Sequence, residues 1–260
     1  MEKNNYRTIW ISDLHIGSTQ CQADVLLDFL RYNDSEKLYL VGDIIDFWAL
    51  SKKMYWPTEH NTIIQKILKK ARHGTRVIYI PGNHDENVRE YDSYVFGDIV
   101  VKNSDYHTTL QGKRFLIVHG DQYDTIAQYH QWVAKLGSKG YDFLLEVNRF
   151  LKMIRKFIGV QSHFSLAAYV KYKVKNLVQF ISDYEENIVN TLKNEGVDGV
   201  ICGHIHHAEM KMIDKFLYVN TGDFVESCSA IVEHQDGTLE LINWLKQDTL
   251  ATGKAEAKAA

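Results

Sequence analysis

Residues 7–15 read RTIWISDLH, and this stretch indicates the fold class. The segment Arg7 to Ser12 is predicted to be a buried strand that stops at a polar cluster, and apolar residues then recur at helical spacing from Ala23 to Tyr32. The alternation continues with a strand at Lys37 to Val41, a helix at Asn61 to Arg72 and a strand at Arg76 to Ile80. Strands that alternate with helices in this way predict an α/β fold with a parallel sheet.

The rest of the 260-residue chain adds further strands and one long helical stretch. Alternation and turn residues predict strands at Tyr106 to Leu110, Arg114 to Val118, Gly199 to Cys202, Phe216 to Val219, Ala230 to Val232 and Leu239 to Ile242. Residues 123–196 show helical periodicity alone. We expect a single domain over 1–248 with 123–196 as a helical insertion, followed by a disordered Ala/Lys-rich tail at 249–260.

Composition narrows the class of protein. A formal charge of −3 gives no overall attraction to nucleic acid, so no nucleic-acid partner is expected. The three cysteines lack CxxC spacing, which argues against a disulfide framework or a thiolate zinc site and fits a reducing cytosol. The polar first residues, together with the lack of an apolar run of about 18 residues, predict a cytoplasmic protein. Any contact with a membrane, such as the cytosolic face of the inner membrane, would then be peripheral.

Five polar clusters directly follow apolar runs. They are Asp13-Leu14-His15, Gly42-Asp43, Gly82-Asn83-His84-Asp85, His119-Gly120-Asp121 and Gly203-His204-Ile205-His206. One such cluster alone is weak evidence, but open α/β sheets bind ligands at the carboxyl ends of their strands. Side-chain alternation along an extended chain is expected to place Asp13 and His15 on one side. Carboxylates, imidazoles and an amide oxygen suit divalent manganese, iron or zinc.

Together the five clusters resemble the motifs of the calcineurin-like metallophosphoesterases, over residues 13–206. The resemblance implies a four-layer α/β sandwich, two mixed β-sheets flanked by helices, and two divalent ions, with manganese expected and iron or zinc as alternatives. It assigns one ion to Asp13, His15, Asp43 and His206, and the other to Asp43, Asn83, His119 and His204. Two cations that share a carboxylate can produce hydroxide at neutral pH for attack on phosphorus.

Two residues beside these ligands are candidates for catalysis. His84 is expected to stabilise the leaving oxygen, and Asp85 to orient and charge the His84 imidazole. The alternative for Asp85 is a helix cap. Asp121 has the same two interpretations, as the partner of a ligating histidine or as a cap. His207 is expected to point away from the site and is left out of it.

The run GDIIDFW at residues 42–48 resembles the GDxxD/E-x-W run of the UDP-2,3-diacylglucosamine hydrolases of lipid A synthesis. Asp46 is then a hydrogen-bond partner of the motif loops or a cap, and the alternative for Phe47 and Trp48 is that they only pack under the site. In that family an insertion forms a helical lid over the acyl chains, and the insertion here matches it in position and length. The best-known members carry arginine where this sequence has His84. Arginine grips phosphate bidentately and histidine can transfer a proton, so the two suit different leaving groups.

Residues 147–182 of the insertion contain seven basic residues and no acidic one: Arg149, Lys152, Arg155, Lys156, Lys171, Lys173 and Lys175. Apolar residues interleave with the first four at helical spacing, which predicts a cationic amphipathic helix suited to an anionic membrane surface or lipid. The alternative is a helix packed on the core with a solvated basic face. The candidates for substrate contact are Arg149, Lys152, Lys171, Lys173 and Lys175.

Three functions are compatible with this sequence. The first is a metal-dependent pyrophosphatase that cleaves a UDP-linked glycolipid to UMP and a lipid phosphate. The second is a phosphatase or phosphodiesterase of the same fold acting on another lipid, a nucleotide or a phosphoprotein. The third is a non-catalytic, metal-binding scaffold, which the complete ligand set together with His84 argues against.

Overall fold

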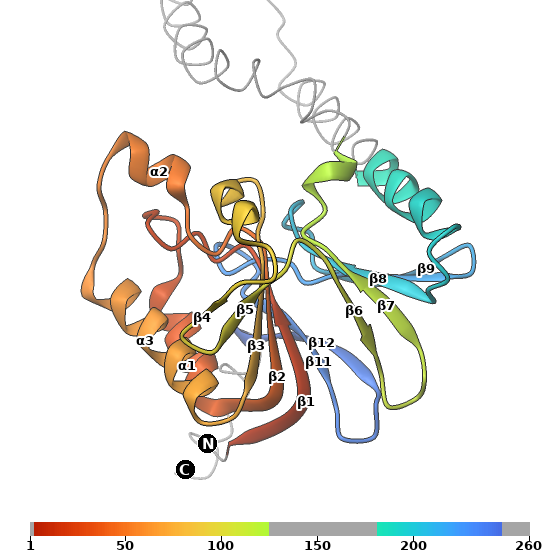
Figure 1. Ribbon diagram of the computed structural model, residues 1–260, viewed down its shortest axis with the longest axis horizontal. Coiled ribbons are helices and arrows are strands. Elements are labelled where there is room, and N and C mark those ends of the chain that lie inside the picture. The colour runs from red at the N-terminus through yellow and green to blue at the C-terminus, as the bar shows by residue number, and fades with distance from the viewer. Residues whose placement is uncertain (1–2, 125–180, 246–260) are drawn as a thin grey trace, which may run out of the picture. The chain divides into compact units, whose positions relative to one another are not determined.

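The computed structural model describes residues 3–124 and 181–245 (Figure 1). The chain divides into two compact units, Met1–Asp121 with Val189–Ala260 and Gln122–Ile188, and the sheets described below belong to the first unit. Most of the insertion expected at 123–196, and the tail expected at 249–260, lie outside the described residues, so the expected domain bounds stay predictions. None of the helices in the described ranges is long and apolar enough to cross a membrane.

The first sheet has seven strands in the order β12-β11-β1-β2-β3-β5-β4. Its parallel centre is formed by β1 (Asn4–Ile11), β2 (Asn33–Val41), β3 (Arg76–Ile80) and β5 (Ile99–Val101). Antiparallel strands complete both sides, with β4 (Val95–Phe96) beside β5, and with β11 (Ser229–Glu233) and β12 (Leu239–Asn243) following β1. The alternation of strands and helices at the start of the chain therefore forms the parallel sheet that the sequence predicts.

The second sheet has five strands in the order β6-β7-β8-β10-β9. Its parallel centre is formed by β7 (Arg114–Ile117), β8 (Gly199–Cys202) and β10 (Phe216–Asn220). The antiparallel strands β6 (Asp105–Thr108) and β9 (Glu209–Ile213) form its two edges. Both sheets are therefore mixed.

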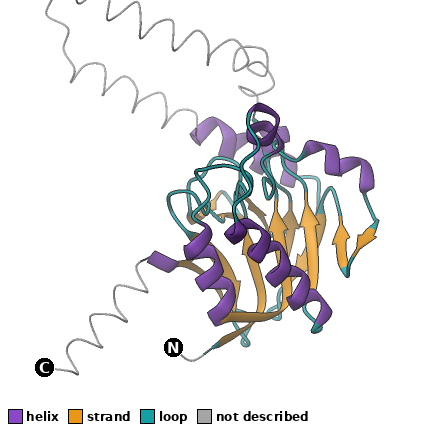
Figure 2. Cartoon of the chain, turned by 90° about the vertical axis from the view of Figure 1, so that its left-hand side faces the viewer, coloured by secondary structure: helices purple, strands orange, loops and turns teal. Residues whose placement is uncertain are grey.

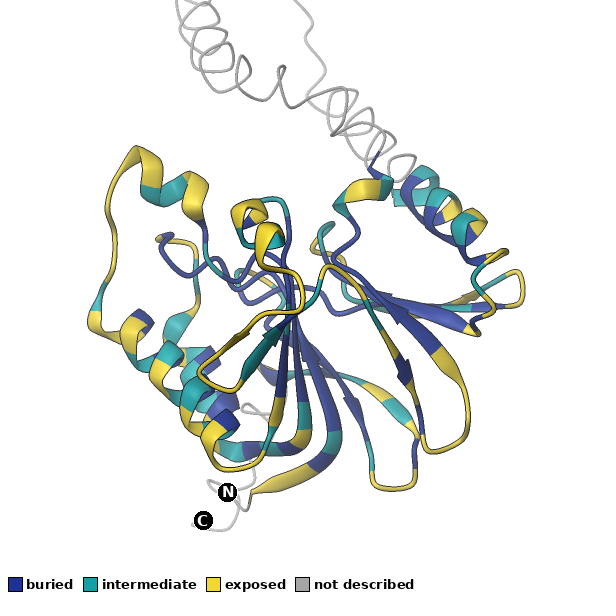
Figure 3. Cartoon of the chain, in the orientation of Figure 1, coloured by how far each residue is buried: buried dark blue, intermediate teal, exposed yellow. Residues whose placement is uncertain are grey.

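The central strands of the first sheet, β1, β2, β3 and β11, are buried over most of their length (Figure 3). Ile9 and Ile11 of β1 pack in the core shared with α1 (Ala23–Tyr32) and α3 (Thr58–Arg72), which lie across that face in Figure 2. Trp10, between them, joins a second core with Phe115 and Val219 of the other sheet. Successive side chains of a strand point to opposite faces, so a strand with a core on each face is apolar throughout. This explains why Ile9, Trp10 and Ile11 are apolar without interruption.

The expected fold class, an α/β fold of two mixed sheets with flanking helices, is confirmed. The helix expected at Ala23 to Tyr32 has those bounds, and α3 begins at Thr58 instead of Asn61. Six of the described elements were not predicted from the sequence: β4, β5, β9, the short helix α2 (Phe47–Lys52) and the 3₁₀ helices η1 (Glu86–Tyr91) and η2 (Asp121–Tyr123). With two and three residues, β4 and β5 are too short to show a period, and β9 is a sheet edge with no fully buried residue.

A buried polar cluster around Glu233 links the two sheets. One carboxylate oxygen of Glu233 lies 2.8 Å from His107 Nε2 and accepts a hydrogen bond from the Thr8 hydroxyl at 3.1 Å. The other accepts hydrogen bonds from the Leu110 amide at 2.9 Å and from the Arg7 guanidinium at 3.1 Å. Burial by itself raises the pKa of Glu233, but hydrogen bonds from His107 and Leu110 hold that pKa below its ordinary value. The cluster therefore stabilises the fold through an ionised carboxylate.

We predict that Glu233→Gln destabilises the protein by about 2 kcal/mol at neutral pH, because hydrogen bonds to a charged acceptor become bonds to a neutral amide. A carboxyl group with a lowered pKa contributes stability above its unfolded value of about 4.3, and this contribution is lost as pH falls through the folded value. The wild-type protein should therefore lose more stability on acidification than the variant, measured by urea unfolding at a series of pH values. The control is Glu240→Gln, whose exposed pair with His234 is expected to matter little. Equal effects of the two substitutions would contradict this role of Glu233.

Candidate metal centre

The five polar clusters lie in the loops that follow β1, β2, β3, β7 and β8. Backbone hydrogen bonds join these loops to one another. The Asp13 amide donates to the Gly42 carbonyl at 3.0 Å, the His15 amide to the Asp43 carbonyl at 2.9 Å, and the Gly203 amide to the His119 carbonyl at 3.0 Å. The structure therefore brings the seven expected ligands together at the carboxyl ends of the strands, as expected for an open α/β sheet.

Five of the seven expected ligands have a left-handed backbone, with φ of 52° for Asp13, 48° for His15, 52° for Asp43, 73° for His204 and 55° for His206. Strained conformations of this kind cost about 1–3 kcal/mol each and gather at functional sites. The convergence of Asp13 and His15 does not arise from strand alternation, the expected cause. Both residues follow the end of β1 and have positive φ, so turns direct their side chains, and not the alternation of an extended strand.

The Asp43 carboxylate occupies the centre of the cluster and is buried. Its Oδ2 lies 3.5 Å from His119 Nε2, 3.9 Å from His84 Nε2 and 4.0 Å from His15 Nε2. Its Oδ1 accepts a hydrogen bond from the His84 amide at 2.8 Å. One carboxylate oxygen that faces imidazoles from several loops is what a residue shared by two cations requires.

The chemistry of Asp13, His15 and His206 fits a cation. Asp13 Oδ1 is fully buried and receives no hydrogen bond from any described residue. It lies 3.2 Å from His206 Nε2, which lies 3.4 Å from His15 Nε2, so three ligand-type atoms face one another. Buried polar atoms normally have partners, and an orphaned carboxylate oxygen beside two imidazoles calls for a positive ion. The residues present therefore fit the metal that the sequence predicts.

His119 is held so that one ring nitrogen faces the cluster. Its Nδ1 lies 3.0 Å from the Val41 carbonyl, a contact in which the ring donates, and its Nε2 lies 3.3 Å from Asn83 Oδ1. A hydrogen bond to one nitrogen fixes the tautomer that leaves the other free for a metal. Gly42 permits this position, because a Cβ there would lie 2.1 Å from His119 Nδ1, and its φ is 78°. Gly42 therefore lets the backbone approach the site closely.

Asp46 connects two histidines of the site. Its Oδ2 lies 3.1 Å from His15 Nδ1 and its Oδ1 2.9 Å from His84 Nδ1, while Oδ1 also accepts a hydrogen bond from the Ala49 amide at the start of α2. Both interpretations left open for Asp46 are therefore correct. Trp48 packs against the His84 ring with centroids 4.1 Å apart. The sequence motif at residues 42–48 could have identified Asp46 as the partner of His84, but spacing alone did not.

Asp85 takes a different position from the expected one. The structure describes Asp46, and not Asp85, as the hydrogen-bond partner of the His84 ring. Asp85 is buried and accepts hydrogen bonds from the Tyr79 hydroxyl and from the amides of Gly82 and Ile44, and its side chain does not cap η1. The Asp85 side chain therefore holds the loop that contains Asp43 by hydrogen bonds to its backbone amides. The Asp121 carboxylate binds Arg89 at 2.7 and 2.8 Å.

The buried carboxylates and imidazoles of the cluster shift one another's pKa values. Burial by itself raises the pKa of Asp43, but the charge and hydrogen bond of His119 hold it well below its usual range. Burial lowers the pKa of His119, and the opposing charge of Asp43 raises it to about 10. Burial also lowers the pKa of His206, but the hydrogen bond and charge of Asp13 raise that pKa above its ordinary value. The protons on the imidazoles thus balance the negative charges of the buried carboxylates. A divalent cation that bound here would displace these protons, so metal affinity is expected to rise with pH.

The basic residues expected to contact substrate, Arg149, Lys152, Lys171, Lys173 and Lys175, lie outside the described residues, as do Arg155 and Lys156. Their roles stay predictions.

A family model for calcineurin-like phosphoesterases matches residues 6–208, which is well over half of the chain. The chain belongs to the calcineurin-like phosphoesterase family. It is therefore a metal-dependent hydrolase, and its family implies divalent ions at the cluster around Asp43. The five loops of the site all lie within the matched range.

Two relatives cover nearly the same length as this chain. The UDP-2,3-diacylglucosamine hydrolase of Aliivibrio fischeri (strain MJ11) is 27% identical over 243 residues, 88% of this chain and 94% of the relative. That of Haemophilus influenzae (strain PittGG) is 26% identical over 239 residues, 86% and 93% of the two chains. Among solved structures, the phosphoesterase Yfce from E. coli is 11% identical with a TM-score of 0.44, and the match covers 91% of this chain and 98% of that one.

Proposed function

We propose that this phosphoesterase is a pyrophosphatase that hydrolyses a UDP-linked, diacylated glucosamine lipid to UMP and a lipid phosphate. Relatives named UDP-2,3-diacylglucosamine hydrolase align over 88% and 86% of the chain, which supports a substrate of this class. The observation that carries the proposal is an exposed apolar surface beside the metal centre, because a lipid substrate needs apolar contacts close to the reacting phosphates.

We assign the two ions as the family resemblance does, Asp13, His15, Asp43 and His206 to one and Asp43, Asn83, His119 and His204 to the other. Manganese is our expected metal, since imidazole, carboxylate and amide donors suit borderline divalent ions. When bound, the ions supply Lewis acidity at the phosphoryl group and a nucleophile at neutral pH. Asp43 faces ligands of both sets, which supports its place between the two ions.

We propose that His84 acts on the leaving oxygen, and its contacts support this role. Asp46 holds its Nδ1 at 2.9 Å, and its Nε2 lies 3.9 Å from Asp43 Oδ2. Burial lowers the pKa of His84, but the hydrogen bond with Asp46 and the charge of Asp43 raise it above the ordinary value. A protonated imidazole beside the reacting phosphate can donate a hydrogen bond or a proton to the leaving oxygen. Asp46 acts through His84 and is a positioning residue.

The exposed apolar surface is formed by α2 and the segment after it. We call it the 47–56 segment, and its exposed apolar residues are Phe47, Trp48, Met54, Tyr55 and Trp56. Met54 is 77% exposed, and Trp48 contacts the His84 ring directly. Large apolar side chains in one exposed segment mark a binding surface more often than chance exposure does. The segment also carries Lys52 and Lys53, which suit an anionic lipid surface, so we propose peripheral contact with the cytosolic face of a membrane.

The experiment compares UMP release from UDP-2,3-diacylglucosamine and from its deacylated form. We expect the acylated substrate to be hydrolysed faster, and the double variant Phe47→Ser/Met54→Ser to lose roughly tenfold or more of that preference, since each buried apolar side chain contributes about 1.5–3 kcal/mol. The matched control is Leu110→Ser/Met212→Ser, which removes two other exposed apolar residues, one from the turn between β6 and β7 and one from β9. Equal hydrolysis of the two substrates by the wild-type protein would show that no acyl chain is recognised.

A second candidate is a phosphodiesterase or phosphatase of the same family with another substrate. The observation in its favour is His84 itself, since the best-known lipid A hydrolases have arginine there and histidine can protonate a poorer leaving group. Hydrolysis of a generic aryl phosphodiester without release of UMP from the acylated substrate would favour this candidate.

A further inference from the structure

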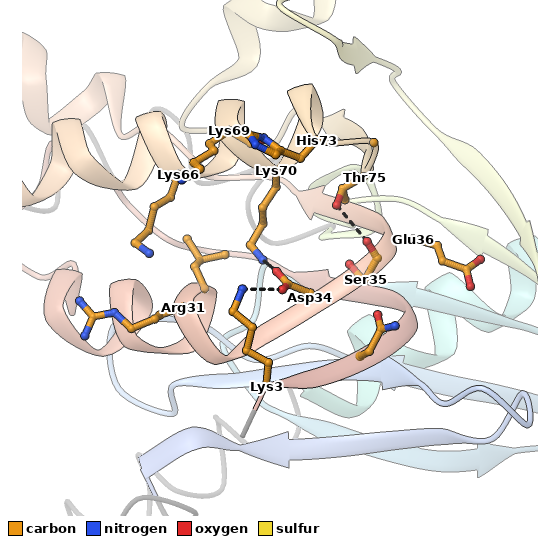
Figure 4. A pocket seen from close by; sticks show the side chains of 13 residues that line it. Lys3, Arg31, Asp34, Ser35, Glu36, Lys66, Lys69, Lys70, His73 and Thr75 are labelled. Carbon is orange, nitrogen blue, oxygen red and sulfur yellow. Dashed lines mark hydrogen bonds and ion pairs between the residues drawn. The ribbon is translucent and has the colours of Figure 1, made fainter. Parts of the chain in front are cut away.

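A cavity of about 550 Å³ lies between α1, α3 and the first residues of β1 and β2 (Figure 4). Five Lys and Arg side chains line it, against two carboxylates: Lys3, Arg31, Lys66, Lys69 and Lys70, with Asp34 and Glu36. Figure 4 shows Lys66 and Lys70 extending from α3 while Lys3 extends toward them from the other side. This basic pocket is positive in a chain whose formal net charge is −3. Its charge is therefore a local feature.

Internal ion pairs neutralise only part of the pocket. Asp34 binds Lys3 at 2.8 Å and Lys70 at 2.5 Å. Within the described residues, no carboxylate lies at salt-bridge distance from Arg31, Lys66 or Lys69. Burial lowers the pKa of Lys66, and the charges of Arg31, Lys70, Lys3 and Lys69 lower it further. Among the described residues the pocket thus holds more cations than its carboxylates pair, an arrangement that a bound anion would relieve.

The basic pocket is separate from the metal centre. Lys3 and Asp34 stand at the starts of β1 and β2, whereas the metal ligands follow the ends of these strands. The eight residues of β1 span roughly 25 Å at the usual rise per residue. A ligand in the pocket therefore makes no contact with the reacting phosphate.

We propose that the basic pocket binds the phosphate group of a small soluble molecule. Several ammonium groups and a guanidinium at one place match the multiple charges of phosphate. The volume exceeds that of a phosphate ion and leaves room for a molecule of nucleotide size. The exposed large apolar residues of the described chain do not line the pocket, so the surface offers nothing to insert into a bilayer. This favours a soluble ligand over a lipid headgroup.

Amide chemical shifts of the full, zinc-loaded chain test the proposal, with inorganic phosphate as the probe and ionic strength held constant with chloride. We expect saturable shifts at Gly74, Thr75 and Ser35, which line the pocket. Lys66→Glu/Lys69→Glu should weaken this binding by about tenfold or more, because it removes two unpaired cations and adds two anions. The control Lys113→Glu/Lys215→Glu makes the same charge change at two exposed turns and should bind as the wild type does.

The outcomes separate this site from the catalytic one. Amide shifts near Asp43 would report phosphate bound at the metal centre. We expect these shifts, and the rate of hydrolysis, to be unchanged in Lys66→Glu/Lys69→Glu. The proposal is overturned if the pocket shifts do not saturate, if the double variant keeps them, or if vesicles containing phosphatidic acid produce them and soluble phosphate does not. If the double variant does not fold, as judged from its own spectrum, Lys69→Ala alone should still weaken binding, because Lys69 is exposed and makes no side-chain bond among the described residues.

Discussion

Replacing Asp43 by alanine is expected to abolish both metal binding and hydrolysis. Asp43 Oδ2 faces three imidazole nitrogens at 3.5 to 4.0 Å, so its loss removes the ligand at the centre of the cluster. Loss of a partner that merely orients a ligand lowers metal affinity by about 10- to 100-fold, and loss of the central carboxylate should cost more. Elemental analysis after dialysis measures the metal, and manganese-dependent cleavage of an aryl phosphodiester measures the activity.

Two further variants make the Asp43 result specific. Asp43→Asn keeps an acceptor for the His84 amide at the position of Oδ1, so its fold is expected to survive while metal binding fails. Asp236→Ala removes an exposed carboxylate from a turn, where it accepts a hydrogen bond from the Thr238 amide, and should retain metal and activity. An Asp43→Ala protein with normal metal content and normal rate would contradict the assignment of the site.

Replacing His84 by alanine is expected to lower kcat by about 10²- to 10⁴-fold, the usual contribution of a general acid. Metal content should stay close to that of the wild type, because His84 is not among our assigned ligands. This separates His84 from Asp43, whose loss removes the metal. The control is His207→Ala, since His207 is exposed and lies 3.7 Å from Glu209. A His84→Ala variant as active as His207→Ala would exclude a catalytic role.

The pH profile distinguishes a proton donor from a packing residue at position 84. A histidine that acts as an acid is active while protonated, so the rate falls as pH rises through its pKa. The Asp46 carboxylate raises that pKa, so Asp46→Asn should lower it and move the alkaline fall in rate to lower pH. An unchanged profile in Asp46→Asn would show that His84 does not titrate in the reaction.

Much of the fold and of the metal centre followed from the sequence because local signals agreed there. The apolar run before Asp13 has the length of a strand buried on both faces, and each expected ligand follows such a run. The pairing of Asp85 with His84 was wrong, because adjacency in sequence did not reveal that Asp46, thirty-eight positions earlier, reaches the His84 ring. Neither was the backbone strain at Asp13 and His15 predictable, since no residue there has the preference of glycine for positive φ.

Features formed by residues that are distant in sequence could not be predicted from local patterns. Lys3, Arg31 and Lys66 belong to separate segments with ordinary surface composition, and only the packing of α1 and α3 beside the first sheet brings them into one pocket. The short helix α2 was missed because six residues are fewer than two helical turns, too few to show a period. Its exposed aromatic residues, Phe47 and Trp48, were interpreted only as part of the motif at residues 42–48.

The central claim is that the cluster around Asp43 holds two divalent ions. It is tested most directly by an anomalous difference map from crystals grown with manganese and measured at the manganese edge. We predict two peaks about 3.5–4 Å apart, with the Asp43 carboxylate between them, Asp13 and His206 beside one, and Asn83 and His119 beside the other. A map with no peak at Asp43, or with a single peak under saturating manganese, would contradict the account.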